Sequence, residues 1–137
     1  ANTDQGLMVP VIKDADQKNL KEISQELLRL SEDARSGKIK LEDLQGGTFT
    51  ISSLGGFGGV GFTPIINPPE VAILGVARAQ IRPIMIKGKF LPRLILPLSL
   101  SYDHRVIDGV GGIQFTTALK GLLESPELFL PEEVKNG

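Results

Sequence analysis

The sequence predicts an α+β fold in which helices pack on one side of an antiparallel sheet. Three observations indicate this fold: a helical hydrophobic period over residues 14–37, two β-rich runs on either side of a glycine turn at Lys87–Lys89, and a second helical period from about Val110 to Glu124. Strands joined by hairpins pair antiparallel, and amphipathic helices bury their apolar faces against a sheet. The expected order is therefore strand, helix, several strands and a final helix.

The first part of the chain predicts one strand and one helix. Gly6 to Lys13 is a short apolar run with β-branched residues, which is typical of a strand. Apolar residues then recur at steps of three and four, at Leu20, Ile23, Leu27, Leu30 and Ala34. This spacing predicts an amphipathic helix whose apolar stripe faces the core. We expect Asp14 or Asp16 to cap its start and Gly37 to end it.

The next segment predicts a strand followed by a glycine-rich loop. Thr48 to Ser53 alternates and is rich in β-formers, and it leads into "LGGFGGVGF". Gly56, Gly58 and Gly61 match the spacing of a dinucleotide-binding loop, which requires a helix to open at the third glycine. The residues that follow hold three prolines between Pro64 and Pro69, which disfavour a helix. We therefore expect a tight or mobile loop that flanks a substrate channel rather than a nucleotide site.

The last strand of the predicted sheet leads directly to a cluster of ionisable residues. Apolar side chains alternate with proline, serine and aspartate at Leu96, Leu98, Leu100 and Tyr102, so one face of this arm should pack on a core. The chain then reaches His104, the only histidine of the sequence. The helix from about Val110 to Glu124 follows, and Pro126 is expected to end it.

Composition excludes several classes of function. The chain has 137 residues, enough for one domain, with 41% apolar and 23% charged residues. Its net charge is −1 and its basic residues are not clustered, which argues against nucleic acid and anionic membranes as partners. With no cysteine and one histidine, the chain offers neither a thiolate nor a multi-histidine metal site, and no metal is expected. The N-terminal residues lack the pattern of a signal peptide, so an intracellular protein is expected.

Four ionisable residues lie within six positions around His104. They are Asp103, His104, Arg105 and Asp108, and Gly109 follows them. A lone histidine at the end of a strand is more often structural than catalytic. A cluster of charged neighbours at the junction of a strand and a helix favours a functional site, because such neighbours fix a tautomer and shift a pKa. Asp103 and Arg105 are expected to form a structural ion pair.

The segment "DHRVIDG" resembles the D-H-R-x-x-D-G signature of the dihydrolipoamide acyltransferases, the E2 core enzymes of 2-oxo acid dehydrogenase complexes. The wider H-x-x-x-D-G pattern is shared with chloramphenicol acetyltransferases. "GGTFTISSLGGFGG", "TPIINPPEVAILGV" and "LPLSLSYDHRVIDG" resemble the same family in order and spacing, from about Asn2 to the second helix. The resemblance implies a chloramphenicol-acetyltransferase-like fold. Family catalytic domains are longer, so residues 1–137 are expected to be the C-terminal part of one, without lipoyl and peripheral-subunit-binding domains.

The resemblance implies acyl transfer between coenzyme A, as a substrate, and the dihydrolipoyl group of a separate lipoyl domain. Acetyl is the expected acyl group, since the motifs are more similar to the pyruvate-complex members than to the succinyl ones. His104 would be the general base, and Asp108 would assist proton transfer or hold the site together. Ser52 would stabilise the oxyanion, with Ser53 as the alternative. Ile65 and Leu74 would line the coenzyme A channel, although ordinary core packing explains them equally well.

The resemblance also implies an assembly. The active site would lie between the subunits of a homotrimer, and trimers would build a larger core that works with lipoyl domains and the E1 and E3 components. The location would be the cytoplasm, or the mitochondrial matrix in a eukaryote. Two alternatives stay open. One is a non-catalytic assembly fragment of such a core, and the other is an antibiotic-type O-acetyltransferase, which "SYDHR", "INPPEVAILG" and the 5% aromatic content disfavour.

Overall fold

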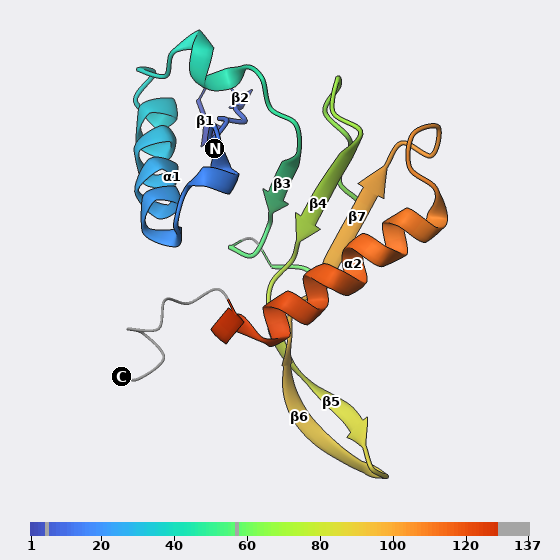
Figure 1. Ribbon diagram of the computed structural model, residues 1–137. Coiled ribbons are helices and arrows are strands. Elements are labelled where there is room, and N and C mark those ends of the chain that lie inside the picture. The colour runs from blue at the N-terminus through green and yellow to red at the C-terminus, as the bar shows by residue number, and fades with distance from the viewer. Residues whose placement is uncertain (5, 57, 129–137) are drawn as a thin grey trace. The chain divides into compact units, whose positions relative to one another are not determined.

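The computed structural model describes residues 1–4, 6–56 and 58–128, which form two compact units, Ala1–Thr50 and Ile51–Gly137. The first unit contains β1 (Asn2–Thr3), β2 (Gly6–Leu7), the 3-10 helix η1 (Ala15–Gln17), α1 (Leu20–Arg35) and the 3-10 helix η2 (Leu41–Leu44). The second contains β4 (Ala72–Val76), β5 (Gln80–Ile86), β6 (Lys89–Ile95), β7 (Leu98–Tyr102), α2 (Gly109–Glu124) and η3 (Pro126–Leu128), and β3 (Thr50–Ser53) begins at the boundary. Figure 1 traces these elements, which confirm the predicted mixed fold of helices and sheets.

The predicted strand from Gly6 to Lys13 is wrong beyond Leu7. Only Gly6 and Leu7 pair, antiparallel with Asn2 and Thr3, and the chain that follows forms no strand up to Lys13. Pro10 has no N–H to donate to a ladder, and the Val11 N–H donates to the carbonyl oxygen of Asp43 instead, at 2.8 Å. The apolar run is therefore held by the η2 segment and not by a neighbouring strand.

Helix α1 begins later than predicted, at a different cap. The Asn19 Oδ1 accepts a hydrogen bond from the Glu22 N–H at 3.0 Å, and Glu22 Oε2 accepts from the Asn19 N–H at 2.8 Å, which is a capping box. Asp14 has left-handed backbone angles and makes no capping bond, and Asp16 lies within η1. The expectation of a cap at Asp14 or Asp16 is therefore wrong, because a cap requires the extended backbone that Asn19 has. Gly37, at φ 70°, follows the last turn as predicted.

The apolar stripe of α1 is buried only toward its C-terminal end. Leu30 and Ala34 are 1% and 2% exposed, and they form the buried core of the first unit. Leu20 and Leu27, which the periodicity placed on the same face, are 62% and 58% exposed. The stripe is thus longer than the surface that covers it within this unit.

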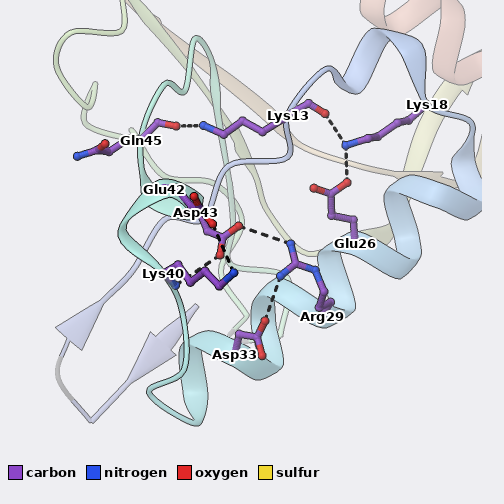
Figure 2. A network of polar contacts seen from close by, with 9 residues as sticks. All are labelled: Lys13, Lys18, Glu26, Arg29, Asp33, Lys40, Glu42, Asp43 and Gln45. Carbon is purple, nitrogen blue, oxygen red and sulfur yellow. Dashed lines mark hydrogen bonds and ion pairs between the residues drawn. The ribbon is translucent and has the colours of Figure 1, made fainter.

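Charged side chains connect α1 with the segments that flank it in sequence (Figure 2). Lys18 pairs with Glu26 and donates to the carbonyl oxygen of Lys13, and Lys13 donates to the carbonyl oxygen of Gln45. Arg29 contacts Asp33 at 3.1 Å and Asp43 of η2 at 3.6 Å. These pairs are partly or largely solvent-accessible, and pairs near the surface each contribute little, about 0–1 kcal/mol, so the network orients the loops of the unit more than it stabilises them.

The second unit is built on a three-stranded sheet in the order β3-β4-β7. β4 is central and contributes the buried core residues Ala72, Ile73 and Leu74. β4 and β7 are antiparallel, with Ala72 opposite Tyr102 and Val76 opposite Leu98. Figure 1 shows β3 and β4 running in the same direction, which the long connection between them permits. The expected antiparallel pairing therefore holds for β4–β7, and β3 departs from it.

The predicted hairpin is present as β5 and β6. The two strands pair antiparallel from Gln80 opposite Ile95 to Ile86 opposite Lys89. Lys87 and Gly88 form the two-residue loop with φ of 49° and 78°, the backbone of the hairpin turn that favours glycine. The second arm is not one continuous strand, because Leu96 and Pro97 are not in strand conformation and separate β6 from β7.

Helix α2 packs on the sheet through a glycine. A Cβ on Gly112 would lie 2.7 Å from Cε1 of Tyr102, so the helix backbone meets the aromatic ring of β7 directly. The residues described between β3 and β4 contain no helix, which agrees with the proline argument, and Phe57 of the glycine run lies outside the described residues. Neither α1 nor α2, the α-helices of the described part of the chain, has the length and apolarity needed to cross a bilayer.

Candidate active site

The turn between β7 and α2 is held by its own backbone and by one ion pair. The Asp103 N–H donates to the carbonyl oxygen of Val71 at 2.8 Å, which continues the β4–β7 ladder past the strand end. The Asp103 carbonyl oxygen accepts from the N–H groups of Val106 and Ile107. The Arg105 guanidinium donates to both carboxylate oxygens of Asp103, at 2.6–3.1 Å. The sequence-predicted structural pair is confirmed.

Hydrogen bonds from Arg105 lower the pKa of the Asp103 carboxyl to about 2. We expect Arg105→Ala to return this pKa toward 3.8, the ordinary value. A carboxylate with a lowered folded-state pKa favours folding above its ordinary pKa, and this contribution disappears as pH falls from 3.8 to about 2. Carboxyl-carbon NMR titration of both proteins measures the shift. An unchanged midpoint in the variant would show that the guanidinium is not the cause.

His104 is the second residue of this turn and its side chain is exposed. Its imidazole faces the ring of Tyr102, with the ring centroids 5.8 Å apart and the planes tilted by 36°. No hydrogen bond engages the imidazole among the residues that the structure describes. An exposed base on a pinned turn has the geometry needed to accept a proton from an arriving substrate.

Asp108 caps helix α2. Its backbone is extended, with φ −85° and ψ 171°, and Oδ1 accepts a hydrogen bond from the Gly111 N–H at 2.7 Å. The carboxylate therefore occupies the N-cap, where it satisfies a helix donor and complements the positive end of the helix dipole. Two roles were considered for Asp108, assisting proton transfer and holding the site together, and these contacts favour the second.

The capping role predicts how substitutions at Asp108 rank. Asp108→Ala is expected to lower the free energy of unfolding by about 1 kcal/mol, because it removes the cap. Asp108→Asn is the matched control, since asparagine caps as well as aspartate and should keep most of the stability. Urea unfolding followed by circular dichroism measures both. Equal losses in the two variants would mean that the negative charge matters here and the cap bond does not.

Ser52 lies on β3, half-buried, on the same strand face as the buried Thr50. Ser53 points to the opposite face and is exposed. Because β4 separates β3 from β7, Ser52 lies two strand spacings, about 10 Å, from β7, and His104 follows β7 in the turn. A single chain thus presents the serine on β3 and the histidine just after β7, and these two strands are not neighbours.

The two expected channel residues lie in different environments. Ile65 is 88% exposed. The residue before it, Pro64, packs against β4, since a Cβ on Gly75 would lie 3.2 Å from the proline ring. Leu74 is 6% exposed in the centre of β4. It shares a sheet face with Tyr102, because Ala72 lies opposite Tyr102 and side chains alternate along a strand. The two side chains thus differ in exposure, and their role in binding stays a prediction.

The structure adds two residues to the site. Tyr102 lies next to His104 and packs against Gly112, a relation between a strand and a helix that linear spacing does not reveal. The only available signal was the aromatic residue two positions before the histidine. In the described ranges, no three histidine, cysteine, aspartate or glutamate side chains gather in a way that could hold a metal ion.

Comparison with known proteins gives consistent matches over nearly the whole chain. Residues 1–130 match the family described as 2-oxoacid dehydrogenases acyltransferase (catalytic domain). The chain is 58% identical over 123 residues to the dihydrolipoyllysine-residue acetyltransferase component of the pyruvate dehydrogenase complex of Cupriavidus necator. It is 56% identical over 117 residues to the same component from Buchnera aphidicola. The matches cover 90% and 85% of this chain, and 22% and 30% of those proteins.

Two solved structures have a similar backbone. One is the structure of Azotobacter vinelandii dihydrolipoamide acetyltransferase, which is 52% identical to this chain with a TM-score of 0.91. It comes from a crystallographic and enzymatic investigation of the role of a serine, a histidine and an asparagine in the catalytic mechanism. The other is the cubic core of the pyruvate dehydrogenase multienzyme complex, with TM-score 0.91 and 51% identity. Each match covers 96% of this chain and 54% of the solved chain. The chain therefore spans about half of those structures.

Proposed function

Because this chain belongs to the family of 2-oxoacid dehydrogenase acyltransferases, in its catalytic domain, we propose that it transfers an acetyl group between coenzyme A and the dihydrolipoyl group of a lipoyl domain. The observation that carries the proposal is the exposed imidazole of His104 on a turn fixed at both sides, by the Asp103–Arg105 pair and by the Asp108 cap. The acetyl assignment rests on relatives that are acetyltransferase components of pyruvate dehydrogenase complexes.

The spacing of the candidate residues supports their roles. In the Azotobacter vinelandii enzyme, the serine and histidine studied for their part in catalysis are 52 positions apart, and the asparagine follows the histidine by four. Here Ser52 precedes His104 by the same 52 positions, and Asp108 follows it by four. Asparagine and aspartate are both good N-cap residues, so the exchange at the third position is compatible with the cap seen at Asp108.

His104 acts as the general base in this proposal. A thiol has an ordinary pKa of about 8.5 and an imidazole of about 6.5, so near neutral pH an imidazole is free to take the proton of a mostly protonated thiol. The imidazole removes the proton from dihydrolipoyl sulfur as that sulfur bonds to the thioester carbonyl carbon of acetyl-coenzyme A. The carbon–sulfur bond to coenzyme A then breaks, and the imidazolium returns its proton to the departing sulfur.

Ser52 stabilises the tetrahedral oxyanion of this reaction. Attack on a thioester places negative charge on the former carbonyl oxygen, and a positioned hydroxyl donor lowers the energy of that state. The Ser52 hydroxyl lies on β3, and no hydrogen bond to another described side chain engages it. Ile65 and Leu74 are proposed to line the coenzyme A path, and Ile65 is the one whose exposure leaves it free to contact a ligand.

We place the reaction in an assembly of this chain. The separation of β3 from β7 supports a site that two subunits complete, with Ser52 and His104 contributed by different copies of a trimer. Large apolar side chains are exposed on the β5–β6 hairpin and on α2: Ile81 74%, Phe90 67%, Leu94 72%, Val110 63% and Ile113 68%. A solved structure that is 51% identical to this chain is the cubic core of the pyruvate dehydrogenase multienzyme complex. We therefore propose that trimers of this chain build a larger core in the cytoplasm. This core would work with a lipoyl domain and with E1 and E3 components.

The test is acetyl transfer from acetyl-coenzyme A to dihydrolipoamide by the purified chain, with succinyl-coenzyme A in parallel. We expect transfer of acetyl and a strong preference for it over succinyl. A preference for succinyl would overturn the acetyl assignment and leave the acyltransferase function in place. No transfer of either group, by protein that sedimentation shows to be assembled, would overturn catalysis by this chain and favour the alternative of a non-catalytic assembly fragment.

A further inference from the structure

Tyr102 is the sole tyrosine of the chain, as His104 is the sole histidine, and the structure places their rings against each other. The centroid distance of 5.8 Å and the 36° tilt are within the range of attractive aromatic pairs. Tyr102 is the last residue of β7, so its main chain belongs to the β4–β7 ladder, where it lies opposite Ala72. Its ring is therefore attached to a strand that pairs with the central strand β4.

The other neighbour of this ring is the backbone of α2. A Cβ on Gly112 would lie 2.7 Å from Cε1, 3.1 Å from Cζ and 3.3 Å from the hydroxyl oxygen of Tyr102. A Cβ on Gly109 would meet the same oxygen at 4.0 Å. Gly112 is buried, and only a residue without a side chain leaves the ring room at this distance. Strand and helix together thus hold the ring in place.

We infer that Tyr102 is a positioning residue for His104, and that packing against Gly112 fixes the position of the tyrosine ring relative to the turn. No hydrogen bond orients the imidazole within the described residues, so the ring contact is what limits its rotation. The inference rests on the proposed function in one respect: the orientation matters for rate because His104 is the base. The contact itself is a structural property that is measured without any activity.

The first measurement uses the two unique rings. Nuclear Overhauser cross-peaks between the ring protons of Tyr102 and His104 need no residue-specific assignment beyond residue type. We expect them in the unsubstituted chain, where each ring is the sole one of its residue type. Their absence from the folded, unsubstituted chain would overturn the inference even if acetyl transfer proceeds.

The second measurement separates positioning from packing. Tyr102→Leu is expected to lower kcat about tenfold with KM within about twofold, whereas Tyr102→Phe keeps kcat, since an aromatic pair stabilises a geometry by roughly this much. Leu100→Ala is the control, because Leu100 lies on the same face of β7 two residues earlier and lacks a ring contact with His104. It is expected to reduce stability and to leave kcat unchanged.

The outcomes distinguish this inference from the proposed function. If Leu100→Ala lowers kcat as much as Tyr102→Leu, the tyrosine acts only through packing and the inference fails. If His104→Ala keeps full activity, the proposed function fails, while the cross-peaks still report the ring contact. Gly112→Ala should shift the His104 ring resonances although residue 112 is on α2, and unshifted resonances would show that the helix does not set the ring position.

Discussion

Replacing His104 with alanine is expected to lower kcat for acetyl transfer about 10²–10⁴-fold, because general-base catalysis contributes that much. The chain has no second histidine and no cysteine that could take over the proton. Asp103, the nearest carboxylate in sequence, is engaged with Arg105 and has a pKa of about 2, which makes it a poor base for a thiol. Steady-state kinetics with acetyl-coenzyme A and dihydrolipoamide measures the loss.

Two controls make this result specific to the imidazole. Val106→Ala shortens an exposed side chain of the same turn, 65% exposed, and should leave kcat within about twofold, because the valine side chain has no group that can accept or donate a proton. His104→Gln keeps a polar side chain without a base and should lose as much activity as His104→Ala. Retained activity in His104→Gln would indicate that the residue binds a substrate instead of moving a proton.

Local sequence signals predicted the elements whose causes are local. The hairpin turn at Lys87–Gly88 and the end of α2 before Pro126 follow from residues within a few positions of each feature. The start of α1 was missed because three candidate caps, Asp14, Asp16 and Asn19, lie within six positions. Asn19 prevails because its backbone is extended and Glu22 completes its capping box, whereas the backbone of Asp14 is left-handed.

Tertiary context explains the other differences. The run from Gly6 to Lys13 has the composition of a strand, but pairing depends on a partner edge, and Val11 donates to Asp43 of a 3-10 segment instead. Periodicity placed Leu20 and Leu27 on a core-facing stripe, yet burial depends on what lies opposite, and both are more than half exposed. A pattern in one helix carries no information about the extent of the surface that covers it.

The candidate site also combines features with local causes and features that depend on tertiary structure. The turn from Asp103 to Asp108 is contiguous, so its ion pair was predictable from the spacing of its charges, and the cap bond of Asp108 to Gly111 is equally local. The contact of Tyr102 with Gly112 depends on how α2 crosses β7, which ten residues of linear spacing do not specify. The placement of Ser52 depends on strand order, and β4 inserts between β3 and β7 from a distant position in the sequence.

Ser52→Ala is expected to lower kcat about 10²–10³-fold, with a smaller change in KM, because a donor to the oxyanion acts mainly in the transition state. The substitution removes one oxygen atom from a half-buried position on β3 and leaves the strand ladder intact. Its effect on the free energy of unfolding should therefore be small compared with its effect on rate. Steady-state kinetics together with urea unfolding of the same preparation separates the two.

Ser53→Ala is the matched control, since it makes the same chemical change one residue later on the opposite face of the same strand. If Ser52 donates to the oxyanion, Ser53→Ala should keep kcat within about twofold, because an exposed hydroxyl on the opposite face of the strand cannot reach the oxyanion. A large loss in Ser53→Ala and none in Ser52→Ala would assign the donor to Ser53. If neither variant loses activity, β3 does not supply the oxyanion donor, and a backbone N–H becomes the better candidate, because backbone donors build many such sites.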